Sequence, residues 1–138
     1  MSFLVDTCAL SELLRPRPSP RVTEWFLATP QTTLFVSVLT LGEIRKGVAM
    51  LGKGRSWAQL TAWLETELSA WAEDRILPID AGVADTWGRL VAQTPSIPAI
   101  DSLIAATALH HRLAVVTRNE TDFADTGVEV VNPWEGWG

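Results

Sequence analysis

Four acidic residues, Asp6, Glu43, Asp101 and Asp122, stand at positions where a carboxylate could take part in chemistry. Asp6 directly follows the apolar residues 3–5, which read as a short buried strand, and a helical pattern begins just after it. An aspartate at such a junction is more often the N-cap of the helix than a catalytic group. A role in chemistry becomes the stronger interpretation only if other acids reach the same edge of a sheet.

The pattern of the chain predicts which elements position these acids. Strands are expected at 3–5, 33–38, 75–79, 113–117 and 128–133, and helices at 7–13, 20–29, 40–51, 56–74, 81–93 and 99–112. Alternating strands and helices favour a parallel sheet with helices on both faces. We therefore expect an α/β fold, a three-layer α/β/α domain with a five-stranded parallel sheet, in which residues 1–138 form a single domain.

Details of single residues refine this expectation. Pro78 suggests that its strand lies at an edge of the sheet, because proline cannot donate to a ladder. Helical spacing predicts that Trp87 faces the core. Trp63 falls off the apolar stripe of its helix, so either a subunit contact or packing against a neighbouring helix is expected.

In this topology the four acids converge. Asp6, Glu43 and Asp122 each follow a strand, and the carboxyl ends of parallel strands meet at one edge of the sheet. The helix that carries Asp101 leads into the strand at 113–117 from the opposite edge, so its start also lies at the carboxyl edge. Asp80 and Asp85 are excluded, as a helix cap and a solvated helix face, whereas the position of Asp125 leaves its role open.

Four carboxylates in one cleft need protons or a counter-charge, because they cannot all stay ionised beside one another. Oxygen ligands without cysteine or paired histidine favour Mg²⁺ or Mn²⁺ over Zn²⁺. Such an ion lowers the pKa of a bound water, and this is the usual apparatus for cleaving phosphodiesters.

Bulk composition limits the alternatives. The 138 residues include 16 acids and 11 bases, for a net charge of −5, which argues mildly against a nucleic-acid binder unless several acids hold metal. One cysteine, Cys8, excludes an internal disulfide and suits a reducing compartment, and we expect it to be a small buried residue rather than a nucleophile. No apolar run is long enough to span a membrane and no signal peptide is expected, so we expect a cytoplasmic protein without a membrane partner.

Four segments carry a family resemblance. They read LVDT at 4–7 with LSEL at 10–13, SVLTLGEIRKG at 37–47, PAIDSLIAATA at 98–108 and VTRNETDF at 116–123. Together they resemble the PIN-domain family, and within it the VapC-type toxins of toxin–antitoxin pairs, FitB-like members included. The resemblance covers nearly the whole chain, and its segments are specific only in combination.

The resemblance implies a Mg²⁺- or Mn²⁺-dependent endoribonuclease that inhibits growth by cutting RNA, is restrained by a cognate antitoxin and forms a homodimer. The implied acidic quartet is Asp6, Glu43, Asp101 and Asp122, the same four that topology brings together. Asp6 and Asp101 would hold the principal metal. Thr7, Thr117 and Asn119 are implied polar neighbours of that site, and Cys8 has no assigned role. Candidates to hold RNA phosphates are the basic residues Arg15, Arg17, Arg45, Lys46 and Arg118, although for each one ordinary solvated surface is at least as good an interpretation.

Rival functions make different demands on the sequence. A haloacid dehalogenase-like phosphatase needs a second aspartate two residues after the first, where this chain has Cys8. A receiver domain needs a lysine late in the chain, and no lysine follows Lys53. A PIN-like binding or regulatory module without ribonuclease activity stays open as the alternative.

Overall fold

The computed structural model describes residues 1–51, 54–71 and 74–135 and contains the expected parallel sheet. Its strands are β1 (Phe3–Val5), β2 (Leu34–Ser37), β3 (Ile76–Leu77), β4 (Ala114–Val116) and β5 (Val130–Val131). They pair in the order β3-β2-β1-β4-β5, and each of these pairings is parallel. The strand that ends in Asp6 is therefore central, and β3, which Pro78 follows, lies at an edge as predicted.

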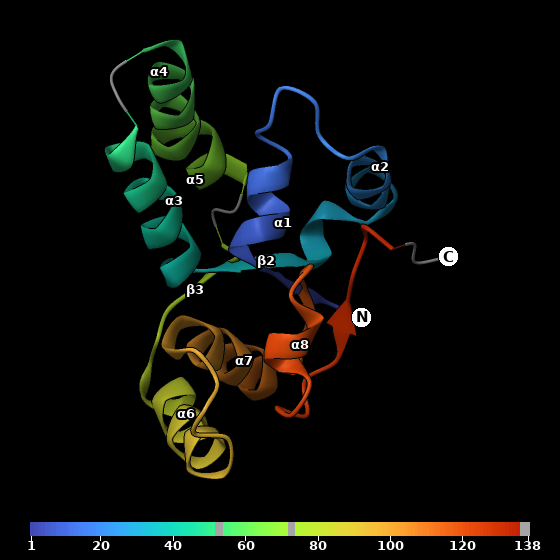
Figure 1. Cartoon of the computed structure of the whole chain (residues 1–138), viewed down its shortest axis with the longest axis vertical. Coiled ribbons are helices and arrows are strands. Elements are labelled where there is room, and N and C mark those ends of the chain that lie inside the picture. Colours follow the sequence, from blue (N-terminus) through green and yellow to red (C-terminus); the bar gives the residue numbers. More distant parts are fainter. Residues whose placement is uncertain (52–53, 72–73, 136–138) are drawn as a thin grey trace.

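Helices cover both faces of this sheet. They are α1 (Thr7–Glu12), α2 (Pro20–Ala28), α3 (Val38–Met50), α4 (Arg55–Ala62), α5 (Leu68–Trp71), α6 (Ala81–Gln93), α7 (Ala99–His111) and α8 (Glu120–Phe123). Figure 1 shows α1 to α5 on one side of the strands and α6 to α8 on the other, which confirms the three-layer α/β/α fold.

Alternating side chains of the central strands build two cores. Val5 and Val116 face the helices α1 to α5, where they pack in one buried cluster with residues such as Leu10. Leu4 and Val115 face the other side, in a cluster with Ile104 of α7. Because successive residues of a strand point to opposite faces, a continuous apolar run is what a strand covered on both sides requires.

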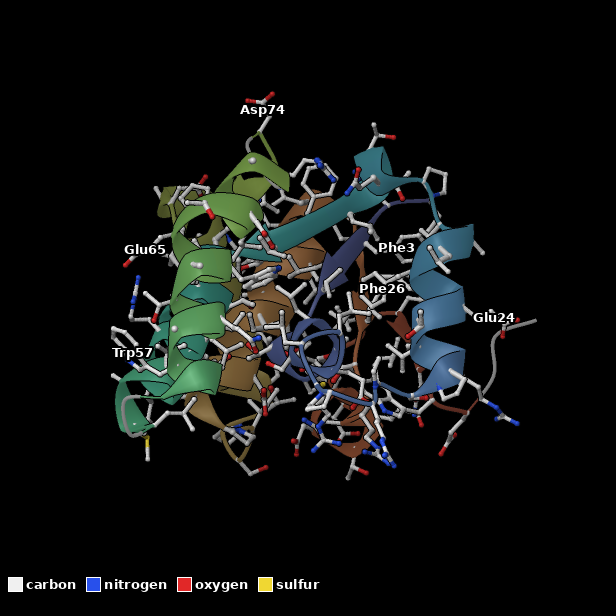
Figure 2. The ribbon with its side chains drawn as sticks, turned by 90° about the horizontal axis from the view of Figure 1, so that it is seen from above. Phe3, Glu24, Phe26, Trp57, Glu65 and Asp74 are labelled. Carbon is white, nitrogen blue, oxygen red and sulfur yellow. The ribbon has the colours of Figure 1, made fainter. Side chains whose placement is uncertain are left out.

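Phe3 anchors α2 to the sheet through aromatic contacts. Its ring meets the ring of Trp25 edge-on, with centroids 5.1 Å apart, and Trp25 meets Phe26 in the same way at 5.2 Å. Figure 2 shows Phe3 and Phe26 close together on the inner side of α2, while Glu24 points away from the sheet. This packing holds α2 against the start of β1.

The region expected as one helix at 56–74 differs from that expectation. It is α4, then a π-helical segment at Trp63–Glu67, then α5, and residues 72–73 lie outside the described part. The N–H of Leu68 bonds to the carbonyl of Trp63, so this turn contains an extra residue and the helical register shifts. Trp63 is half-buried and packs against the core cluster that contains Leu10, as the neighbour-packing interpretation expects.

None of the helices in the described ranges combines the length and the apolar composition that crossing a bilayer needs.

Candidate active site at the carboxyl edge of the sheet

Asp6 occupies the junction of β1 and α1, and its side chain is 4% exposed. Its Oδ1 accepts the N–H of Thr7 at 2.8 Å and so caps α1. Its Oδ2 accepts the hydroxyl of Thr117 at 2.8 Å. The carboxylate is thus both a helix cap and a fixed group at the carboxyl edge, since each oxygen has more than one lone pair to offer.

Thr117 directly follows β4, beside Asp6, and is fully buried. Its oxygen accepts the backbone N–H of Asn119 at 3.1 Å while its hydroxyl hydrogen goes to Asp6. The Asn119 side chain makes no capping bond to α8 and Asn119 is exposed. The structure therefore brings Thr117 into direct contact with the site, and Asn119 through its backbone.

Cys8 lies beside the same carboxylate. Its Sγ is 3.6 Å from Asp6 Oδ2 and 3.4 Å from Thr117 Oγ1. Burial, and next the negative charge of Asp6, raises the pKa of the thiol. Cys8 is partly rather than fully buried, and its raised pKa keeps it a poor nucleophile.

Glu43 reaches the site from α3. Ser37 caps this helix by accepting the N–H of Leu39 at 3.0 Å, and this cap starts the helix immediately after β2. Glu43 then lies in its second turn, where Oε1 accepts the Thr7 hydroxyl at 2.5 Å. Thr7 therefore links Glu43 to the start of α1.

Asp101 and Asp122 complete the group from α7 and α8. Asp101 stands in the first turn of α7. Its pKa is raised to about 6, mainly by burial, then by the charges of Asp6 and Asp122, a hydrogen bond with Asp122 and the charge of Glu43. The other three predicted acids therefore all lie close enough to Asp101 for their charges to act on it.

The spacing of these acids limits how they could hold an ion. Among the described residues, no three of these four acids have carboxylate oxygens that all lie within 4.8 Å of one another. The group of three metal-binding side chains that does meet this distance lies elsewhere in the described chain. Mg²⁺ usually keeps several waters and takes only one or two carboxylates directly. An all-oxygen set at this spacing therefore fits a partly hydrated hard cation rather than a dry protein cage.

The predicted basic residues do not form one cluster at the acids. Arg15 lies 3.6 Å from Glu12, and Arg45 lies 3.1 Å from Glu65. Arg118, next to Thr117, stacks over the ring of Trp134 at 5.4 Å from its centroid. Arg17 and Lys46 are exposed.

Three further acids, Asp80, Asp85 and Asp125, are not among the four predicted site acids. Asp80 caps α6 by accepting the N–H of Val83 at 2.9 Å, and exposed Asp85 pairs with Arg89. Both match their predicted roles. Asp125 is exposed and lines a small hollow of about 190 Å³ with Asp122.

Two residues near the site were not predicted. Thr40 is fully buried in α3, with its hydroxyl 3.4 Å from that of Thr7. It precedes Glu43 by three residues, a helical spacing that could have indicated a shared face. Glu12 is also buried, and it accepts the N–H of Ser19 at 2.9 Å, which ties the proline-rich loop back onto α1.

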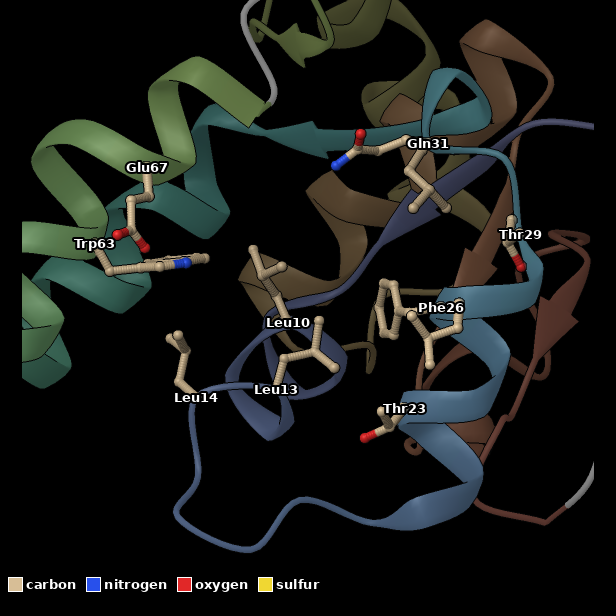
Figure 3. A pocket seen from close by; sticks show the side chains of 11 residues that line it. Leu10, Leu13, Leu14, Thr23, Phe26, Thr29, Gln31, Trp63 and Glu67 are labelled. Atoms are coloured by element: carbon tan, nitrogen blue, oxygen red, sulfur yellow. The ribbon is translucent and has the colours of Figure 1, made fainter.

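A largely apolar groove runs beside α1. Figure 3 shows Leu10, Leu13 and Leu14 between Trp63 on one side and Phe26 of α2 on the other. This part of the groove has a volume of about 700 Å³. A second hollow, lined in part by the same Leu14 and Trp63, extends to Glu43. Apolar surface therefore leads from α2 to the rim of the acidic group.

Comparison with known proteins agrees with this geometry. The protein-family model described as the PIN domain matches residues 3–129. The chain belongs to the PIN-domain family. This PIN domain is 37% identical over 136 residues to Toxin FitB of Neisseria gonorrhoeae, covering 96% of the chain and 98% of the relative. It is 33% identical to VapC ribonuclease Y4jK of Sinorhizobium fredii, with coverage of 96% and 98%.

A solved structure has the same fold. It is described as the structure of FitAB bound to an IR36 DNA fragment, and it superposes on this PIN domain with a TM-score of 0.89 at 37% identity. The match covers 96% of this chain and 95% of that one.

Proposed function

We propose that this PIN domain is the toxin of a toxin–antitoxin pair, an endoribonuclease that hydrolyses RNA phosphodiester bonds with Mg²⁺ or Mn²⁺. The convergence of Asp6, Glu43, Asp101 and Asp122 at one sheet edge is the observation that carries this proposal. Similarity to Toxin FitB and to a VapC ribonuclease supports it.

Asp6 and Asp101 are the residues that would hold the ion, with Glu43 and Asp122 completing its surroundings directly or through water. A bound divalent ion supplies an activated water and stabilises charge on the phosphate. The chain's own contribution is positioning. Thr7 and Thr117 fix Asp6 through one bond to each oxygen, and Thr7 also orients Glu43.

Basic side chains would hold the RNA backbone. The candidates remain Arg15, Arg17, Arg45, Lys46 and Arg118. Arg118 is the strongest of them, because its backbone N–H contacts Cys8 Sγ at 3.5 Å, which places it next to Asp6. Arg45 would have to leave Glu65 in order to reach a phosphate, a small cost for an exposed pair.

We further propose that a cognate antitoxin binds the groove between α1, α2 and the π-helical segment. Its largely apolar lining suits an apolar segment of a partner, and Glu43 and Glu67 at its borders suit a basic side chain on that segment. We also expect residues 1–138 to act as one domain and the protein to be a homodimer in the cytoplasm. Light scattering of the purified protein measures whether it is a dimer.

Cleavage of labelled RNA by the purified chain tests the nuclease. Mg²⁺ or Mn²⁺ should support cleavage and EDTA should abolish it. Asp6→Asn keeps a side-chain oxygen to cap α1 but loses the charge, so its rate should fall by more than about 100-fold. Asp85→Asn, on an exposed helix face, is the matched control and should retain full activity. Full metal-dependent cleavage by Asp6→Asn would refute the assignment.

Induced expression tests the biological role. The chain alone should arrest growth, the Asp6→Asn variant should not, and co-expression of the neighbouring gene product should restore growth. A purified chain that binds a partner but cleaves no RNA under any metal condition would favour a PIN-fold regulatory module instead.

A further inference from the structure

Three metal-binding side chains gather at the end of the α6–α7 hairpin. Asp80, His110 and His111 each offer a ligand atom, and these atoms all lie within 4.8 Å of one another. Asp80 is the N-cap of α6, and the two histidines form the last turn of α7, so the antiparallel packing of the two helices brings them together. Asp101 lies nine residues earlier on α7, about 14 Å along the helix axis, so this cluster is separate from the acidic group.

A second observation points to a ligand. The Nε2 atom of His111 is buried and makes no hydrogen bond within the part of the chain that the structure describes. A buried polar atom without a partner is costly, and a metal ion can accept the lone pair of an imidazole nitrogen. Asp80 uses Oδ1 for the Val83 N–H, and a carboxylate has lone pairs beyond that one bond.

Helix electrostatics alone explains only part of this arrangement. Histidines at a helix C-terminus and an aspartate at an N-terminus are each favoured by the helix dipole. The pKa of Asp80 is lowered mainly by its hydrogen bond from the Val83 N–H. The attraction between Asp80 and the two histidines lowers it further. Neither effect provides a partner for His111 Nε2.

We propose that Asp80, His110 and His111 bind a divalent transition metal of the Zn²⁺ class and thereby clamp the start of α6 to the end of α7. Two imidazoles and one carboxylate suit Zn²⁺ and its neighbours and do not suit Mg²⁺. Asp80 and His110 are exposed, so an ion can enter from solvent, and water can fill the remaining coordination position.

Gly82 offers a variant that disturbs the cluster and removes no ligand. A Cβ at Gly82 would lie 2.4 Å from Cε1 of His110, so alanine forces the imidazole to move. Gly88 is in the same helix and a Cβ there would meet nothing within 4 Å. Gly88→Ala makes the same substitution in the same helix without this clash, so it is the matched control.

The experiment is a Zn²⁺ titration of the full-length, tag-free chain after EDTA treatment, followed by calorimetry and by thermal melting, with Mg²⁺ titrated in parallel. An Asp6→Asn background separates this cluster from the acidic group and Cys8. Zn²⁺ should raise the Tm of the wild type, the Asp6→Asn background and Gly88→Ala alike, and Mg²⁺ should have no effect in that background.

His110→Gln, Asp80→Asn and Gly82→Ala should each weaken Zn²⁺ binding by more than about tenfold. Asparagine is also a good N-cap, so Asp80→Asn keeps the start of α6 intact. It therefore still tests the site if His110→Gln fails to fold. The proposal is overturned if Zn²⁺ does not bind in the Asp6→Asn background, or if it binds Asp80→Asn and Gly82→Ala as tightly as the control.

Discussion

Thr117, at the end of β4, donates its hydroxyl hydrogen to Asp6 Oδ2 at 2.8 Å, which joins the carboxyl ends of two neighbouring strands. The bond is fully buried and fixes one oxygen of the acid that we propose anchors the metal.

Replacement of Thr117 by valine keeps the shape and removes this bond. Asp6 Oδ2 and the Asn119 N–H both lose a partner, so the free energy of unfolding should fall by about 1–3 kcal/mol. Urea denaturation measures the change. Thr117→Ser retains the hydroxyl and should lose less stability than Thr117→Val. A stability of Thr117→Val equal to that of the wild type would contradict this contribution of the bond.

The raised pKa of Asp101 predicts a pH dependence. In the folded chain the pKa is about 6, above the ordinary aspartate value of about 4. The folded state therefore binds more protons, so the contribution of Asp101 to stability is present at low pH and is lost as pH rises from about 4 to above 6.

Asp101→Asn should accordingly raise Tm in EDTA above about pH 7 and change it little below about pH 4. Thermal melts across this range check the effect, with Asp85→Asn as the exposed control. Mg²⁺ should stabilise the wild type more at the higher pH, since protons then no longer compete for Asp101. A Tm increase that is the same at every pH would contradict this explanation.

Cys8 should react slowly with iodoacetamide, because only the thiolate reacts and both burial and Asp6 raise its pKa. Asp6→Asn removes the charge that raises the pKa, so alkylation near neutral pH should become faster. Mass spectrometry of timed samples measures the rate. An unchanged rate, with the fold intact by circular dichroism, would show that burial alone protects the thiol.

Leu27 tests the groove without disturbing the core. It lines the groove and is 83% exposed, so Leu27→Glu should leave stability nearly unchanged while placing a charge in the proposed antitoxin contact. Toxicity should persist, but rescue by the neighbouring gene product should weaken. Met50→Glu, at an apolar residue of similar exposure that does not line this groove, should be rescued as well as the wild type.

Arg118 tests the proposed RNA contacts. In the inactive Asp6→Asn background, Arg118→Ala should reduce RNA affinity and lower the salt dependence of binding by about one counterion. Fluorescence anisotropy at several salt concentrations measures both quantities. Arg89→Ala removes an equal charge from α6, and an equal effect of the two variants would indicate nonspecific electrostatics.

Topology made the acidic group predictable, because each acid lies just after a strand or at the start of a helix whose direction follows from the chain. Local spacing did not foresee that the helix expected at 56–74 is interrupted by a π-helical turn at Trp63–Glu67. Trp87, expected in the core, is 36% exposed and donates to Ser102 Oγ at 2.8 Å. The hydrogen bond from its ring nitrogen to a residue of α7 holds Trp87 in this position, and hydrophobic periodicity does not predict such a bond.

The cluster of Asp80, His110 and His111 could not be predicted from the sequence either. Asp80 is 30 positions from His110, and their proximity depends on how far α6 and α7 slide along each other. Pairing between helices of an antiparallel hairpin is set by side-chain packing, and a hydrophobic pattern alone gives no axial offset.

The order β3-β2-β1-β4-β5 has a consequence for synthesis of the chain. Until β4 has left the ribosome, β1 has a neighbour on one side only, and neither Thr117 nor Asp122 is available to join Asp6. A nascent or truncated chain that ends before β4 therefore leaves one side of β1 unpaired and lacks Asp122, one of the four acids. The parts proposed for RNA cleavage thus come together only when nearly the whole polypeptide exists.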